Sequence, residues 1–165
     1  MTQPPTSQPL DQPRFFFEDL APSMEFMSAG RTITEADIVA FAGLSGDYNQ
    51  LHVDAEFAAT TVHGERIAHG LLVLSILSGL STRVSLMLAL GEQIVGLAGL
   101  ECRWKRPAKI GDTLRVKLVV SDLRLTSKGD SGMVTLNRDA VNQREEVVME
   151  SVWKLLIRCR GKDTE

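Results

Sequence analysis

The feature that most constrains the fold is a predominantly apolar stretch from Ile67 to Leu80. Aliphatic side chains fall on every side of a helix drawn through it, so such a helix must be covered almost all round. The stretch is shorter than the roughly 20 residues that a membrane-spanning helix needs. It is followed by the polar residues Ser81-Thr82-Arg83. The sequence therefore predicts a buried helix at the centre of the protein.

The rest of the chain after about residue 90 has the pattern of β-strands. Apolar and polar residues alternate, as in half-buried antiparallel strands. Strands are expected at 24–33, 94–104, 113–125 and 133–141, and in a last segment where Val147, Met149, Trp153, Leu155 and Ile157 share one face. Turns are expected at 127–130 and 142–143, and residues 110–112 begin the second long strand. The pattern predicts an α+β domain, with one antiparallel sheet curved around one apolar helix.

Length and charge limit the classes of protein. The chain has 165 residues, enough for one domain with its own core, and a net charge of −3, which argues against a general nucleic-acid binder. Cys102 and Cys159 lack metal-ligand spacing, so reduced, packed thiols in a cytoplasmic protein are expected. Residues 1–15 are rich in proline and glutamine and lack a signal-peptide core, which predicts a flexible tail. The expected domain spans 16–160, with a short tail at 161–165.

A carboxylate and an imidazole stand five residues apart in the segment FAGLSGDYNQLH, as Asp47 and His52. On one helix they would project from different faces, so they can converge only if residues 46–49 leave helical geometry. Glycine, aspartate and asparagine favour that departure. Converging side chains of this kind can activate water. The alternative is that Asp47 caps the next turn and His52 is an ordinary histidine.

A second motif, His69-Gly70, stands at the predicted start of the apolar helix. The Gly70 amide would then be among the unpaired N–H groups of the first turn, at the positive end of the helix dipole. Such an amide can bind a developing oxyanion, although a glycine at a helix entry is by itself common.

Together these segments, from residue 33 to about 80, resemble the hydratase motif of MaoC-like dehydratases and (R)-specific enoyl-CoA hydratases. The family loop reads approximately S-G-D-x-N-P-h-H, where h is apolar, followed by H-G-h at the central helix. Residues 45–49, Leu51-His52 and 69–71 match it, whereas Gln50 replaces the usual proline. The resemblance implies a hot-dog fold, (R)-specific hydration of trans-2-enoyl-CoA or the reverse dehydration, and a homodimer or dimer-based oligomer. It implies no cofactor, since coenzyme A is part of the substrate, and no nucleic-acid or membrane partner.

The resemblance also implies residue roles. Asp47 and His52 would hold the catalytic water, the Gly70 amide would polarise the thioester carbonyl, and Asn49 and Ser78 would support them. Which of Asp47 and His52 is the base stays open, and Ser78 could equally be a small packing residue. No metal is expected, because the spacing of the three histidines matches no ordinary ligand pattern. His63 is interpreted as an exposed loop residue.

The segment RWKRP is the densest basic cluster and a candidate site for coenzyme A phosphates, through Arg103, Lys105 and Arg106. Solvated basic residues at a strand end are the alternative. Two rival functions also remain at this point: a thioesterase of the same fold, and a non-catalytic domain that binds acyl thioesters. The joint presence of Asp47 and His52 argues against the non-catalytic domain.

Overall fold

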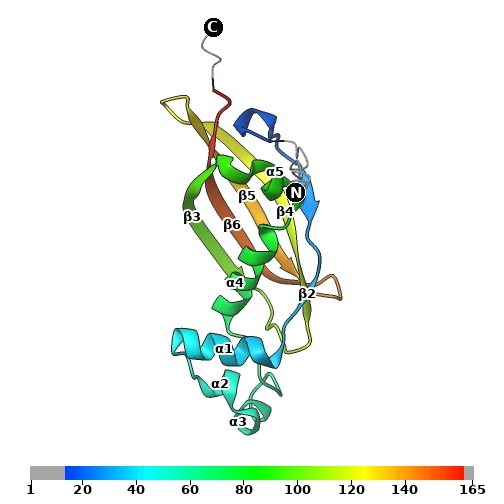
Figure 1. The fold of residues 1–165 in the computed structure, drawn as a ribbon. Coiled ribbons are helices and arrows are strands. Elements are labelled where there is room, and N and C mark those ends of the chain that lie inside the picture. Colours follow the sequence, from blue (N-terminus) through cyan, green and yellow to red (C-terminus); the bar gives the residue numbers. More distant parts are fainter. Residues whose placement is uncertain (1–13, 162–165) are drawn as a thin grey trace, which may run out of the picture.

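A computed structural model describes residues 14–161, which form one antiparallel sheet with helices on one face and at one end (Figure 1). The helices are α1 (Glu35–Ser45), α2 (Gln50–Val53), α3 (Ala55–Ala59), α4 (Gly70–Ser81) and α5 (Ser85–Leu90), with short 3-10 turns at Phe17–Asp19 and Gly91–Gln93. The strands are β1 (Glu25–Met27), β2 (Arg31–Thr32), β3 (Ile94–Trp104), β4 (Thr113–Leu125), β5 (Ser131–Val141) and β6 (Val147–Arg158).

The strand order is β1-β4-β5-β6-β3, and β2 also pairs with β4. All pairs are antiparallel, and α4 lies across the face of the sheet (Figure 1). This is the sheet wrapped around a central helix that the sequence predicts, the hot-dog arrangement. The strand β3 is at the edge of the sheet, with its other side unpaired among the described residues.

The core lies between α4 and the inner face of the sheet. Alternate residues of β4 point inward, and Val116, Leu118 and Val120 are fully buried. From the helix, Leu77 is also fully buried. Burying one such side chain contributes about 1.5–3 kcal/mol, so this interface fixes α4 on the sheet. The helix is not covered all round in the single chain, however, because Leu71 is 59% exposed.

The first strand differs from the expectation for 24–33, because it is broken into β1 and β2. Ser28 lies at the break: its Oγ accepts the Val116 N–H at 2.8 Å, and its own N–H donates to the Val116 carbonyl. At Gly30 a Cβ would come within 2.9 Å of Thr113, so the chain there approaches β4 too closely for a side chain. A polar side chain thus interrupts the ladder where the alternation predicts continuity.

The last residues of the expected N-terminal tail contact the domain. Most of the expected tail, residues 1–13, lies outside the described residues, but Phe15 donates its N–H to Ala89 at 2.9 Å and packs against the core. The expected C-terminal tail also lies outside them from residue 162. Cys102 and Cys159 are both free thiols, as predicted. No single helix among residues 14–161 is long and apolar enough to cross a membrane. The segments Gly70–Ser81 and Ser85–Gln93 together are, but they are bent by 62° at their junction.

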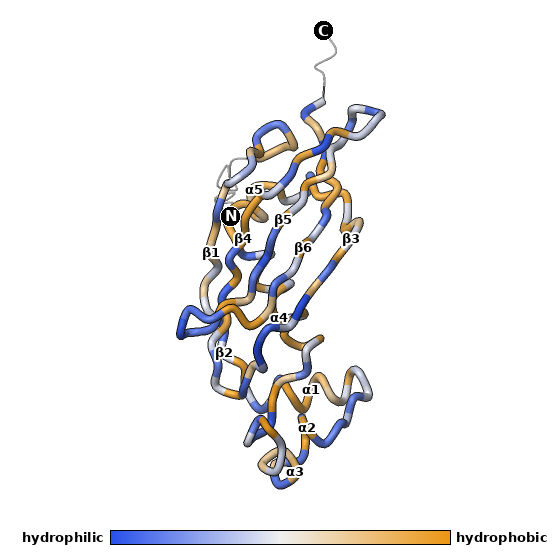
Figure 2. Tube along the Cα trace, turned by 180° about the vertical axis from the view of Figure 1, so that it is seen from behind, coloured by the Kyte–Doolittle hydropathy of each residue, from blue (hydrophilic) through white to orange (hydrophobic). Residues whose placement is uncertain are grey.

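The three short helices α1, α2 and α3 lie beyond the end of the sheet, close to the start of α4 (Figures 1 and 2). Thr34 and Asp37 cap α1 reciprocally: the Thr34 Oγ accepts the Asp37 N–H, and the Asp37 carboxylate accepts the Thr34 N–H. Arg31 of β2 pairs with Asp37 as well. These contacts attach α1 to the sheet and so place the loop that follows it.

Candidate active site

The loop after α1 leaves helical geometry, as the sequence predicts. Gly46 ends the helix in the left-handed region, with φ of 75°, and its N–H bonds the Ala42 carbonyl. Asn49 is extended, with φ of −56° and ψ of 132°, and its side chain caps α2 by accepting the Leu51 N–H at 3.0 Å. A left-handed C-cap followed by an asparagine N-cap turns the chain sharply, and Asp47 lies inside that turn.

Asp47 is exposed and is oriented by local hydrogen bonds. Its Oδ1 accepts the Asn49 N–H at 3.2 Å, and its own N–H donates to the Ser45 hydroxyl at 3.2 Å. Asn49 thus supports Asp47 through its backbone and begins α2 with its side chain.

His52 is half-buried on α2, with one ring nitrogen fixed. Its Nδ1 lies 2.8 Å from the carbonyl oxygen of Ile67. A carbonyl can only accept, so Nδ1 carries the proton in this contact, and the Nε2 of a neutral ring keeps a free lone pair. The atom of His52 that can exchange a proton with a bound water is therefore Nε2.

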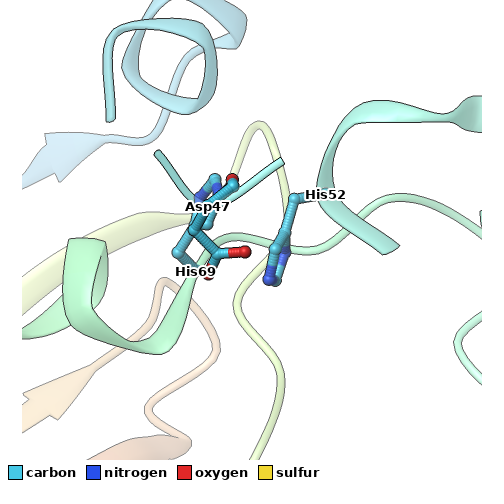
Figure 3. A group of neighbouring side chains, drawn as sticks. All are labelled: Asp47, His52 and His69. Atoms are coloured by element: carbon cyan, nitrogen blue, oxygen red, sulfur yellow. The ribbon is translucent and has the colours of Figure 1, made fainter. Parts of the chain in front are cut away.

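The side chain of His69, which had no predicted role, lies next to both Asp47 and His52 (Figure 3). Its ring is 1% exposed, its Nε2 lies 3.0 Å from the Asp47 carbonyl oxygen, and its centroid is 3.9 Å from that of His52. One polar atom each from Asp47, His52 and His69 lies within 4.8 Å of the others. Two hydrogen bonds of about 2.8 Å through one water can span such a separation.

The same three residues have the composition and the proximity of a possible metal site. A metal ion lies in the plane of each imidazole that coordinates it, at about 2.1 Å from the nitrogen. The rings of His52 and His69 are stacked, inclined by only 32° with centroids 3.9 Å apart. One nitrogen of each ring contacts a backbone carbonyl oxygen, which leaves His52 Nε2 and His69 Nδ1 as the atoms that could face an ion.

Gly70 is the first residue of α4, as predicted, and its N–H has no acceptor among residues 14–161. Its carbonyl oxygen accepts the indole Nε1–H of Trp104 at 2.9 Å. A Cβ at Gly70 would lie 2.9 Å from that nitrogen. Only glycine therefore fits beneath the indole, and its free amide is at the positive end of a helix of 12 residues.

An open pocket of about 290 Å³ joins His52 and Gly70, whereas Asp47 is not part of its lining. Its lining includes His52 and Gly70 with Trp104, Lys105 and Arg106. His63 also lines it and is half-buried, so the interpretation of His63 as an exposed loop residue is wrong. A positively charged rim next to His52 and Gly70 suits a substrate that carries an anionic group.

The predicted basic cluster is divided by the structure. Lys105 and Arg106 line this pocket, whereas Arg103 lines a separate depression with Glu101, Asp139 and Glu150. The pocket cations form ion pairs, Lys105 with Glu150 at 3.3 Å and Arg106 with Glu146 at 3.7 Å, and all four side chains are substantially exposed. Exposed pairs of this kind are weak enough to exchange for a phosphate.

Ser78 is not among the residues that gather around Asp47. It lies eight residues into α4 from Gly70, about 12 Å along the helix axis. It is half-buried, and its hydroxyl has no hydrogen bond to the described residues, unlike Ser75 and Ser81, which bond back to carbonyls in α4.

Comparison with known proteins identifies the family. The family model described as MaoC like domain matches residues 20–142. An (R)-specific enoyl-CoA hydratase of Rhodospirillum rubrum is 33% identical over 150 residues, which cover 88% of this chain and 94% of the relative. An enzyme of the same name from Aeromonas caviae is 39% identical over 93 residues, 54% of this chain and 63% of the relative. The chain spans only 30% of Protein MaoC of Klebsiella aerogenes, to which it is 38% identical.

Solved structures agree with the fold. The MaoC-like dehydratase from Rhodospirillum rubrum superposes with a TM-score of 0.80 at 34% identity, over 90% of this chain and 99% of that one. A Mycobacterium tuberculosis protein described as a double hot-dog fold has a TM-score of 0.77 at 22% identity, over 92% of this chain and 46% of that one, which supports the fold alone. On the family match and these relatives, the chain belongs to the MaoC-like dehydratase family.

Proposed function

We propose that this protein adds water to trans-2-enoyl-CoA to give the (R)-3-hydroxyacyl-CoA, or catalyses the reverse dehydration. The observation that carries the proposal is that Asp47 and His52 lie within reach of one water, in a site that also contains the free Gly70 amide. Hydration needs these two elements: a group that takes a proton from water, and a donor that accepts charge at the thioester oxygen.

In the hydration direction, the water oxygen bonds to C3 and gives up one proton. The π electrons of the C2–C3 bond move toward C2 and the thioester oxygen, forming an enolate. The N–H of Gly70 donates to that oxygen as its charge develops, supported by the dipole of α4. A proton then bonds to C2, so that the elements of one water molecule are added across the double bond.

The hydrogen bonding of His52 limits how the proton travels. With Nδ1–H held by the Ile67 carbonyl, the Nε2 of a neutral His52 is an acceptor, as is the carboxylate of Asp47. Neither group then has a proton to deliver to C2 at the start of the reaction. The proton taken from water is therefore the one available for C2, which favours addition to one face of the substrate.

The coenzyme A part of the substrate would bind along the basic rim of the pocket. Lys105 and Arg106 line the pocket next to Gly70 and can bind phosphate oxygens of coenzyme A. Arg103 is left out of this assignment because it lines the other depression.

The enzyme would act as a homodimer or a dimer-based oligomer. Among the described residues, the strand β3 is an unpaired edge with exposed apolar side chains, Val95 and Leu97 at 52%, Leu100 at 38% and Trp104 at 45%. An edge of this kind is a template for pairing with a second copy. Light scattering is expected to give at least twice the chain mass, and a stable, active monomer would refute this assembly.

The function is tested by incubating the protein with crotonyl-CoA while following both the enoyl absorbance and free thiol. A hydratase removes the absorbance without releasing thiol, a thioesterase releases thiol, and a non-catalytic binding domain changes neither signal. Chiral analysis of the product should give mainly the (R)-3-hydroxy isomer. Release of thiol at the same rate as loss of the enoyl absorbance, or a mainly (S) product, would reject the proposal.

A further inference from the structure

The His69 side chain connects the two parts of the site that must act together. Its Nε2 contacts the backbone of Asp47, and its own backbone continues directly into Gly70 at the start of α4. We propose that His69 is a positioning residue. Its imidazole fixes the position of the Asp47 loop relative to the oxyanion-binding amide of Gly70. This inference rests on the proposed hydratase function and assigns no contact between His69 and the substrate.

The direction of the hydrogen bond fixes the form of the ring. The Asp47 carbonyl oxygen can only accept, so His69 donates from Nε2. The other nitrogen, Nδ1, is buried and has no partner among the described residues. A proton on Nδ1 would be a buried donor without an acceptor, which is costly. His69 is therefore held as the neutral ring with its proton on Nε2.

Packing against two other rings helps to keep the imidazole in this orientation. The ring of Phe41, from α1, lies with its centroid 5.0 Å from that of His69, and the ring of His52, from α2, lies at 3.9 Å. Aromatic rings at such separations attract each other beyond their burial. His69 thus contacts side chains of α1 and α2 and the backbone of the loop between them, as Figure 3 shows for Asp47 and His52.

The consequence for the reaction follows from the spacing of the reacting groups. The carboxylate of Asp47 must face C3 while the Gly70 amide faces the thioester oxygen, and an error of about 1 Å in such an arrangement can cost a hundredfold in rate. Substrate binding depends mainly on the pocket walls formed by Trp104, Lys105 and Arg106. Loss of the His69 contact should therefore lower kcat much more than it changes KM.

Two substitutions distinguish the contribution of the His69 hydrogen bond from that of the packing of its ring. His69→Phe keeps an aromatic ring next to Phe41 and His52 but removes the donor, whereas His69→Gln keeps an N–H donor at similar reach and removes the ring. Ser81→Ala is the matched control, because it removes a buried hydroxyl from the same helix, bonded to Leu77, far from Gly70. All three variants are compared with wild type in melting temperature, kcat and KM for crotonyl-CoA.

We expect His69→Phe to lower kcat by on the order of a hundredfold with KM within about threefold of wild type. His69→Gln should recover at least about tenfold of that loss. Ser81→Ala should keep wild-type kcat despite a lower melting temperature. Near-wild-type kcat in a folded His69→Phe variant, or equal losses in the Phe and Gln variants, would overturn the proposal.

Nitrogen NMR of the wild-type protein with labelled histidine tests the hydrogen bond without any activity. The expected result at neutral pH is a neutral His69 with the proton on Nε2. A proton on Nδ1 alone, or a doubly protonated ring, would show that the proposed neutral ring with its donor at Nε2 is absent. If wild type fails to hydrate crotonyl-CoA, the proposed function and the catalytic consequence of His69 both fall, while the NMR result still decides the contact itself.

Discussion

The indole Nε1–H of Trp104 donates to the carbonyl oxygen of Gly70, so that the end of β3 is joined to the start of α4 at a distance of 2.9 Å. The indole thereby occupies the space where any larger residue at position 70 would put its Cβ. The strand that forms the sheet edge and the helix that offers the oxyanion donor are fixed to each other at the pocket.

Gly70→Ala should therefore displace Trp104, break this hydrogen bond and shift the amide that faces the thioester. We expect a loss of stability of about 1–3 kcal/mol from overpacking, with a fall of at least about tenfold in kcat for crotonyl-CoA. Gly79→Ala is the matched control, since a Cβ at this position on the same helix meets nothing within 4 Å. It should raise the melting temperature through helix propensity. A Gly70→Ala enzyme with normal kcat would remove Gly70 from the mechanism.

Gln50→Pro should be tolerated and stabilise the protein by up to about 1 kcal/mol, through a less flexible unfolded chain. Gln50 is the first residue of α2, its N–H has no acceptor among the described residues, and Asn49 already has the extended ψ of 132° that a following proline requires. Melting temperature and crotonyl-CoA turnover are measured together. Leu51→Pro, which removes the N–H that donates to Asn49, should instead destabilise. A drop in both measurements for Gln50→Pro would show that Gln50 has a role of its own.

Lys105→Ala and Arg106→Ala should each raise KM for crotonyl-CoA by about threefold to tenfold, with little change in kcat, because phosphate contacts act on binding alone. The thioester of N-acetylcysteamine, which has no phosphates, should show no such change. Arg103→Ala should behave as wild type, because Arg103 lines the other depression. Equal effects on both thioesters would exclude a phosphate site at this rim.

Arg138→Met should stabilise the protein by about 1–2 kcal/mol at pH 7, because Arg138 is a buried cation without an ion pair among residues 14–161. Its guanidinium lies over the Trp153 ring and donates to the Met87 sulfur, and its Nε has no hydrogen-bond partner within residues 14–161. Chemical denaturation measures the change, and Arg124→Met, at an exposed position, is the control.

The same variant has a pH dependence with a fixed sign. Burial lowers the pKa of Arg138 from its ordinary value to about 10. Below pH 10 both the folded and the unfolded chains carry this charge, so the folded protein bears the full penalty. Above pH 10 the folded chain releases the proton first, which favours folding. The advantage of Arg138→Met should therefore be constant below pH 10 and shrink above it. An advantage that grows above pH 10 would contradict this.

Much of the fold could be predicted because its signals are local. The alternation of Leu114, Val116, Leu118 and Val120 determines the inward face of β4, and the apolar run after Gly70 determines α4. The break between β1 and β2 could not be predicted, because it depends on a contact between Ser28 and Val116, 88 residues away in the chain.

The site was predictable to a similar extent. Asp47, His52 and Gly70 belong to short motifs whose loop geometry follows from glycine and asparagine. The contact of His69 with Asp47 joins residues 22 apart in the chain and depends on packing between helices, which no local pattern encodes. The separation of Arg103 from Trp104, by contrast, could have been read from the sequence, because successive side chains of a strand point to opposite faces.

The central claim is that Asp47 and His52 act on one water, and crotonyl-CoA hydration by Asp47→Asn, His52→Ala and the double variant tests it most directly. Each single substitution should lower kcat/KM by at least about a hundredfold with little loss of stability, since Asp47 is exposed in a turn and His52 is only half-buried on the short helix α2. The double variant should be hardly slower than the worse single one, because groups that act as a unit are not additive. Near-wild-type turnover in either folded single variant, or losses that multiply in the double variant, would contradict the account.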